Sequence, residues 1–149
     1  MALTIWLVDN AFIHDVEFSG ITVEYDECMQ KLKIQTSDAD AYSYSYDADH
    51  GGYLINFNIS KHFEYSLIKT EEELGKIDGV KVNNLRLYSV QKPAFAFHGD
   101  NLNSPCKNVM LEKIFWNGEP LSKEIFYKHT EKNGFTDGIK YITEKEKKI

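Results

Sequence analysis

The residues best suited to chemistry lie between positions 37 and 50, where acidic and tyrosine side chains alternate along the chain. Six of them could contact a sugar: Tyr42, Tyr44, Tyr46, Asp47, Asp49 and His50. In an extended strand the tyrosines would share one face, because successive side chains point to opposite faces. Tyrosine rings can stack on sugar rings while their hydroxyl groups form hydrogen bonds. The segment therefore predicts a sugar-contact surface, and the alternative is an exposed hairpin with aromatic cross-strand pairs.

The same acidic segment does not match a calcium-binding loop of the EF-hand type. Such a loop needs an acid or amide at its fifth position, but counting from Asp38 places Tyr42 there and counting from Asp47 places Gly51 there. The five histidines and two cysteines form neither a His-Glu-x-x-His nor a Cys-x-x-Cys motif. We therefore expect no metal and no cofactor, with a looser calcium site left as an alternative.

The elements that would position these residues follow a repeat. Three segments share a pattern in which two pairs of alternating apolar residues are separated by a two-residue step. The copies begin at Val16, Val80 and Val109, and a partial fourth begins at Ile139. The alternation is the periodicity of a β-strand. Gly20 and Asn84 end the step in the first two copies and tolerate the positive φ of a bend, whereas Lys113 fits that position less well.

Repeated strands with a shared bend predict an all-β fold, a short right-handed parallel β-helix of about three to four rungs. Equivalent residues would then stack on one another in two rows, Val16–Val80–Val109–Ile139 and Ile21–Leu85–Ile114. Residues at roughly 27–74 would form an inserted excursion with its own strand between 53 and 59 and a helical turn beginning at Thr70. The alternative is an antiparallel β-sandwich.

Length and composition limit the function further. The 149 residues are expected to form a single domain, 1–149. A net charge of −6 argues against binding to nucleic acid or to an anionic membrane surface. No apolar run is long enough to span a membrane, and the start of the chain does not resemble a secretory signal. We expect Cys28 and Cys106 to be free, buried thiols, and the alternative is one disulfide between them. These features leave the localisation unassigned.

Two of the repeat copies resemble a known family. The segment 13–26, Ile-His-Asp-Val-Glu-Phe-Ser-Gly-Ile-Thr-Val-Glu-Tyr-Asp, and the segment 107–120, which ends in Asn-Gly-Glu-Pro, are similar to late rungs of right-handed parallel β-helix glycoside hydrolases. These enzymes form the polygalacturonase-like group of the pectin-lyase-like superfamily. The resemblance implies that this chain is a C-terminal fragment of a longer β-helix protein.

The family's catalytic signatures do not occur in this sequence. Asn-Thr-Asp, Asp-Asp and Gly-His-Gly are all missing, and the nearest string, His98-Gly99-Asp100, does not match. The resemblance therefore assigns no catalytic residue and leaves enzyme activity undecided. It implies a C-terminal part of a carbohydrate-active enzyme, catalytically incomplete alone, that caps the solenoid and contributes to a polysaccharide-binding cleft. The alternatives are a non-catalytic carbohydrate-binding module and a protein–protein interaction domain.

The two ends of the chain suggest a partner. A charged segment, 144–148, follows the last repeat and could cover the C-terminal end. The N-terminal stretch 3–8 starts directly in apolar alternation, which would leave an open edge. We therefore expect either a homodimer through the N-terminal end, with Ile5, Trp6 and Leu7 near the centre of the contact, or an N-terminal strand that folds across its own end.

Overall fold

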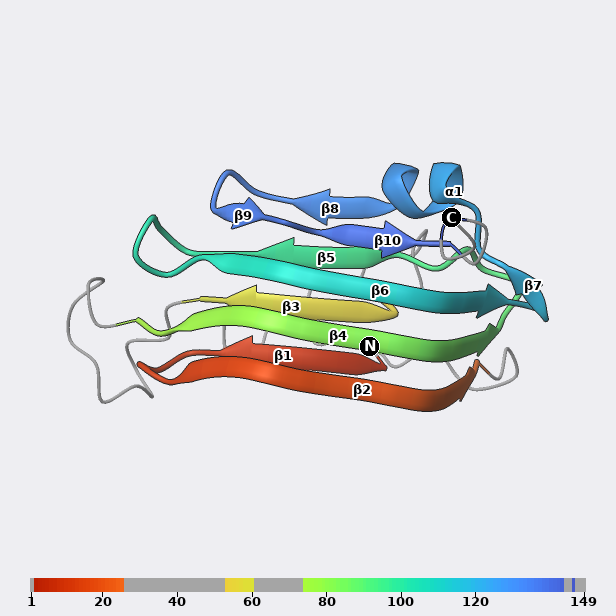
Figure 1. Cartoon of the computed structure of the whole chain (residues 1–149), viewed down its shortest axis with the longest axis horizontal. Coiled ribbons are helices and arrows are strands. Elements are labelled where there is room, and N and C mark those ends of the chain that lie inside the picture. The colour runs from red at the N-terminus through yellow and green to blue at the C-terminus, as the bar shows by residue number, and fades with distance from the viewer. Residues whose placement is uncertain (1, 26–52, 61–73, 144–145, 147–149) are drawn as a thin grey trace, which may run out of the picture.

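The computed structural model describes residues 2–25, 53–60, 74–143 and 146. These residues are mostly β-structure, arranged in two sheets (Figure 1). The first sheet has four parallel strands in the order β1 (Leu3–Leu7), β3 (Ile55–Ile59), β5 (Phe95–His98) and β8 (Thr130–Lys132). The second contains β10 (Lys140–Ile142), β6 (Cys106–Trp116), β4 (Lys76–Tyr88) and β2 (Phe12–Glu24), in that order and also parallel. Two short strands pair with β6, namely β7 (Glu119–Pro120), which is antiparallel, and β9 (Thr136–Asp137).

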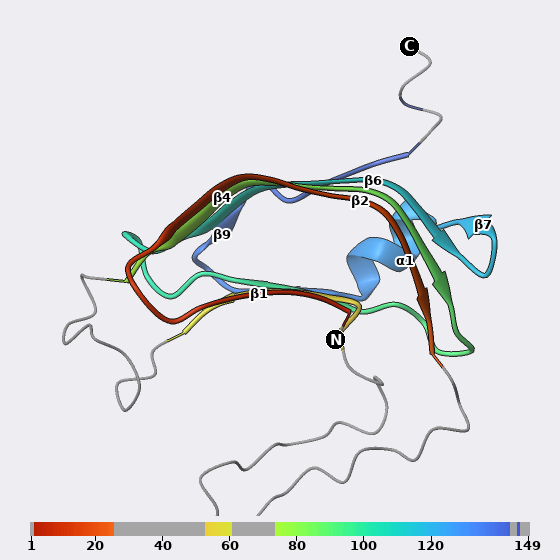
Figure 2. The same ribbon diagram turned by 90° about the horizontal axis from the view of Figure 1, so that it is seen from below.

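The prediction of a short right-handed parallel β-helix is wrong. The described strands form two sheets of parallel strands, and no closed or solenoid sheet joins them. In Figure 2 the sheet with the long strands curves over the flatter four-stranded sheet, and the core fills the space between the two. The physical reason for the error is that apolar alternation specifies which side chains point inward, whereas it does not specify how the two sheets are joined at their margins.

The expected excursion at 27–74 is also corrected. The predicted strand between 53 and 59 exists as β3, but it lies in the middle of the four-stranded sheet between β1 and β5. Its alternate residues Ile55, Phe57 and Ile59 are at most 2% exposed, so this segment belongs to the core and is no appendage. The helical turn expected at Thr70 lies outside the described residues.

The register of the long strands agrees with the neighbours that the repeat predicted. Val16 pairs with Val80 and Val80 with Val109, while Ile21 pairs with Leu85 and Leu85 with Ile114. The last expected neighbour, Ile139, precedes β10, in which Lys140 pairs with Met110. The repeat thus predicted which residues lie side by side in the second sheet.

Two rows of residues with positive φ bend the long strands. The predicted row contains Gly20 (φ 70°), Asn84 (φ 57°) and Lys113 (φ 52°), so the lysine adopts the strained conformation in spite of its side chain. A second row, which the repeat did not predict, contains Asp15, Gly79 and Asn108, a few residues earlier in β2, β4 and β6, and Gly138, which lies between β9 and β10. These four residues are aspartate, asparagine or glycine, the types that adopt positive φ most readily. Between the two rows each strand has a short straight segment, and the sheet curves at both (Figure 2).

One expected surface residue is buried. The pattern places Glu112 at an outward position, yet it is 6% exposed because its strand neighbours Asn83 and Ile142 lie on either side of it. Its carboxylate Oε2 lies 3.9 Å from Nζ of Lys81, and Lys81 Nζ also lies 4.0 Å from Oε1 of Glu17. A buried acid is therefore held beside a lysine in a row of charges across the outer face of this sheet.

Cys106, the cysteine in the described part of the chain, is the free, buried thiol that the sequence predicted. It has no exposed surface. Burial, and to a smaller degree the negative charge of Asp78, raise the pKa of its thiol to about 12. The thiolate is therefore not formed near neutral pH, and Cys106 acts as a small apolar core residue. Cys28 lies outside the described residues.

Candidate functional site

The sugar-contact residues expected from the sequence all lie outside the described part of the chain: Tyr42, Tyr44, Tyr46, Asp47, Asp49 and His50. Their arrangement stays a prediction. The described residues contain two other surfaces with groups that could recognise a ligand, one on the outer face of the four-stranded sheet and one at the carboxyl ends of the long strands.

The first surface is made by the outward residues of the four-stranded sheet, which we call the polar face. In β1, Leu3, Ile5 and Leu7 point inward while the residues between them are exposed. In β3 the residues between the buried ones are partly exposed, and in β5 only His98 is partly exposed. The polar face comprises Thr4, Trp6, Asn56, Asn58, His98 and Glu131, and Ala96, which has no exposed surface, lies between Asn56 and Glu131.

The register places these side chains in two rows across the strands. Trp6 pairs with Asn58, and Asn58 pairs with His98. In the adjacent row Asn56 pairs with Ala96, and Ala96 pairs with Glu131. Because neighbouring parallel strands lie about 4.8 Å apart, an indole, an amide and an imidazole follow one another at that interval along the first row.

Trp6 offers the largest aromatic surface of the polar face. It is 58% exposed, although a tryptophan loses much free energy by staying in water. Its indole Nε1–H donates a hydrogen bond of 2.6 Å to Oγ of Ser60, directly after β3. The bond fixes one edge of the indole against the sheet and leaves more than half of the side chain accessible.

The other margin of the polar face carries a charged hydrogen-bond network. His98 Nε2 lies 3.1 Å from Oε1 of Glu131, and the Tyr53 hydroxyl donates a bond of 2.5 Å to Oε2 of the same carboxylate. The carboxylate is therefore oriented from two sides. Glu131 is nevertheless 58% exposed in its side chain, so it can still accept hydrogen bonds from a ligand.

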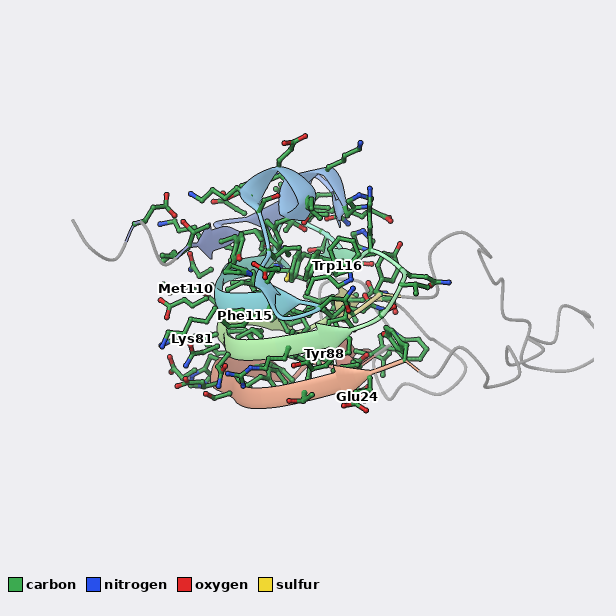
Figure 3. The ribbon with its side chains drawn as sticks, turned by 90° about the vertical axis from the view of Figure 1, so that its right-hand side faces the viewer. Glu24, Lys81, Tyr88, Met110, Phe115 and Trp116 are labelled. Carbon is green, nitrogen blue, oxygen red and sulfur yellow. The ribbon has the colours of Figure 1, made fainter. Side chains whose placement is uncertain are left out.

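The second surface is an open groove of about 370 Å³ at the carboxyl ends of the long strands, which we call the end groove. Its lining consists of Glu24, Tyr25, Tyr88, Ser89, Val90 and Asn117, and Figure 3 shows Glu24 and Tyr88 at the ends of neighbouring strands. Tyr88 is 42% exposed. Burial raises the pKa of Tyr25, so this phenol stays protonated at neutral pH.

Much of the polar capacity of the end groove is already used within the protein. The Asn117 side chain accepts a bond from Ser89 N at 2.9 Å and donates one to Ser89 O at 2.8 Å. The Trp116 indole, half-buried against the core, donates a further bond of 2.9 Å to the same carbonyl. These three bonds fix the loop that follows β4. The end groove is therefore mainly a structural junction, and the polar face is the stronger candidate for a ligand.

The described residues give no indication of a metal centre or a membrane-spanning element. Within ranges 2–25, 53–60 and 74–143, no group of three histidine, cysteine or acidic side chains is placed to bind a metal ion. In the same ranges no helix is both long and apolar enough to cross a membrane, since α1 (Lys123–Lys128) has six residues.

Comparison with known proteins adds no assignment: no family model, no curated protein and no solved structure matches this chain. The resemblance to β-helix glycoside hydrolases therefore has no independent support.

Sequence reasoning missed the polar face, although a signal for it was present. In the segments Leu3–Leu7 and Ile55–Ile59, a tryptophan and two asparagines alternate with apolar residues that point inward. Alternation alone predicts that these residues share the outer side of their strands. Only the pairing of β1 with β3 and of β3 with β5 places them next to one another.

Proposed function

We propose that this chain binds an oligosaccharide or polysaccharide through the polar face and is a non-catalytic part of a carbohydrate-active protein. The observation that carries the proposal is the exposed indole of Trp6 in one register row with Asn58 and His98.

The chemistry of the row matches that of a sugar chain. A sugar ring presents apolar C–H groups on one face and hydroxyl groups around its edge. Trp6 can stack on the apolar face, because its ring is large, rigid and accessible. Asn58 and His98 can donate and accept hydrogen bonds with hydroxyl groups of successive rings. A sugar chain lying across the strands would meet the three groups in order over about 10 Å.

The groups of the polar face do not amount to a hydrolytic site. Glycoside hydrolysis usually needs two carboxylates roughly 5 to 9.5 Å apart, one of which acts as an acid. The four strands that form this face carry one carboxylate, Glu131. We therefore assign Glu131 to hydrogen bonding with sugar hydroxyls.

Binding can be tested by titrating the protein with defined oligosaccharides from a glycan-array screen and following the heat of binding. We expect Trp6→Ala to weaken binding at least about tenfold, because buried tryptophans dominate many contacts. His98→Ala should weaken it less, since it removes one hydrogen-bonding group. The matched control is Tyr127→Ala on α1, which removes another exposed aromatic ring, 52% exposed, from a different surface.

A tryptophan-fluorescence titration gives a second readout of the same contact. In a Trp116→Phe background Trp6 is the one tryptophan, so a bound sugar should change its emission directly. Binding that is unchanged by Trp6→Ala, or no binding to any glycan at millimolar concentration, would contradict the proposal.

A further inference from the structure

Glu131 places an oriented negative charge on the polar face. Its Oε1 lies 3.1 Å from Nε2 of His98, and its Oε2 accepts a bond of 2.5 Å from the Tyr53 hydroxyl. The side chain is still 58% exposed, and each oxygen of a carboxylate can accept more than one hydrogen bond. A ligand that lies on the polar face therefore meets an anionic acceptor whose direction is already set.

Among the described outward residues of the polar face, no lysine or arginine balances this carboxylate. The four strands of the sheet contain one lysine, Lys132, and it occupies the register position of the buried, inward-pointing Phe97. His98 can become cationic, but it already contacts Glu131. The whole chain has a net charge of −6. The potential at the polar face therefore favours a cationic ligand over an anionic one.

We propose that the sugar chain bound by the polar face carries free, protonated amino groups, and that one of them pairs with Glu131. The amino-sugar assignment rests on the proposed function, since it names the class of sugar that the same surface takes. In an amino sugar an amine replaces one of the hydroxyl groups that Glu131 would otherwise meet. An ammonium group brings three N–H donors and the opposite charge, and a charge-assisted hydrogen bond is roughly twice as strong as a neutral one.

The same charge disfavours acidic sugar chains. The carboxylates of a uronic acid chain would approach Glu131 with no lysine or arginine among the described outward residues to pair with. Like charges brought together at a binding surface suppress the wrong ligand. The polar face is therefore expected to rank sugar chains by charge, with amino sugars first, neutral sugars second and uronic acids last.

The positions of Trp6 and Glu131 set a minimum length for the ligand. Trp6 lies in β1 and Glu131 in β8, which are three strand spacings, or about 14 Å, apart across the sheet. One sugar ring cannot reach both groups. The ring that stacks on Trp6 and the amine that pairs with Glu131 must belong to different residues of one chain, with Asn58 and His98 between them.

Titration calorimetry with oligosaccharides of equal length tests the ranking on the full chain. Oligomers of β-1,4-linked glucosamine and glucose differ by one amine or hydroxyl per ring, and galacturonate oligomers represent the acidic class. At low ionic strength and a pH at which the amines are protonated, we expect the glucosamine oligomer to bind at least about threefold more tightly than the glucose oligomer, as one exposed ion pair allows. The galacturonate oligomer should bind most weakly, and monomeric glucosamine should give no measurable heat.

Glu131→Gln is the decisive variant, because it keeps the size of the side chain and removes its charge. It should bind the glucosamine and glucose oligomers with equal affinity. The matched control is Glu119→Gln, which removes the same charge from an exposed residue of β7 in the other sheet and should keep the preference. Added salt should reduce the preference of the wild type, since it screens an exposed pair. Circular dichroism checks that both variants keep the fold.

The outcomes distinguish the amino-sugar assignment from the proposed function. Equal affinity of the wild type for the glucosamine and glucose oligomers, tighter binding of the galacturonate oligomer, or a preference that survives Glu131→Gln would each overturn the assignment. Binding of the glucose oligomer that is lost in Trp6→Ala would still support the proposed function in those cases. Binding of none of the three oligomers would overturn both.

Discussion

The two opposite edges of the pair of sheets differ in how the core between them is covered: β8 and β10 form one edge, and β1 and β2 form the other. At the edge formed by β8 and β10, α1 and the segment before it cover the space between the sheets. Phe126 of this helix has no exposed surface. Its ring lies 4.8 Å from that of Phe95 and 5.0 Å from that of Tyr141. The Tyr141 hydroxyl donates a bond of 2.7 Å to the carbonyl of Leu121, which is also buried.

At the opposite end, none of the described elements lies beyond the terminal strand β2 of the long-stranded sheet. The inward residues of β2 stay half-buried, although their equivalents one strand further in are fully buried. The contrast teaches that the apolar pattern of a strand sets the direction of its side chains, whereas the neighbouring element sets how much surface they remove from water. Substitutions at equivalent positions of the two ends should therefore have different costs.

The largest effect is expected from truncating Phe126, the buried side chain of α1 at the end of the core that this helix covers. Phe126→Ala would leave a cavity between α1 and β5, and we expect a loss of about 3 to 5 kcal/mol of unfolding free energy. Urea denaturation followed by circular dichroism measures it. Tyr127→Ala, on the exposed side of the same helix, should cost less than about 1 kcal/mol. Equal losses for the two variants would mean that α1 does not cover the core.

A comparison along one register row sharpens the difference between the strands. Leu85→Ala, in β4, should cost about 2 to 5 kcal/mol, because the side chain is fully buried. Ile21→Ala truncates its half-buried neighbour in β2 and should cost about half as much or less. An Ile21→Ala loss as large as that of Leu85→Ala would show that the two side chains remove equal apolar surface from water, which would contradict the difference in their burial.

A smaller effect is expected at the start of α1. The Ser122 hydroxyl caps the helix by accepting a hydrogen bond of 3.2 Å from Ile125 N. Ser122→Ala should lower the unfolding free energy by about 1 kcal/mol, whereas Ser122→Asp should retain the cap. Thermal unfolding of the three proteins checks this order. A cap that could be removed without loss would show that tertiary packing alone holds the helix.

The smallest effect is a pH dependence of the unfolding free energy, caused by the ion pair between Lys123 of α1 and Glu146. Hydrogen bonds from the Lys123 side chain, then from the Thr143 backbone and side chain, lower the pKa of Glu146 to about 2. Because the pKa in the folded protein lies below the usual glutamate value of 4.5, the contribution of this carboxylate to stability is complete above pH 4.5 and is lost as the pH falls towards about 2.

The test compares unfolding of the wild type and Glu146→Gln between pH 6 and pH 2. We expect the difference between the two to shrink slightly on acidification, since an exposed ion pair contributes little. A difference that is constant with pH would show that Lys123 does not pair with this carboxylate in solution.

The sequence by itself determined the strands, their inward residues and much of their register. Val80, Val109, Leu85 and Ile114 are buried and paired as the repeat predicted, because alternation has a fixed period of two and equivalent residues of successive copies are similar in size. The bend residues Gly20 and Asn84 were predictable for a local reason, the low cost of positive φ.

Only the tertiary structure decided how these strands are assembled and what they present. It placed Ile55–Ile59 at the centre of a sheet, buried Glu112 between two neighbours and brought Trp6, Asn58 and His98 into one row from segments far apart in the sequence. These outcomes depend on which strands become neighbours, and the free energy of that choice is distributed over contacts between distant segments. A local pattern does not specify contacts between distant segments. It could therefore predict which side chains share a face of each strand, but neither the two-sheet arrangement nor the polar face.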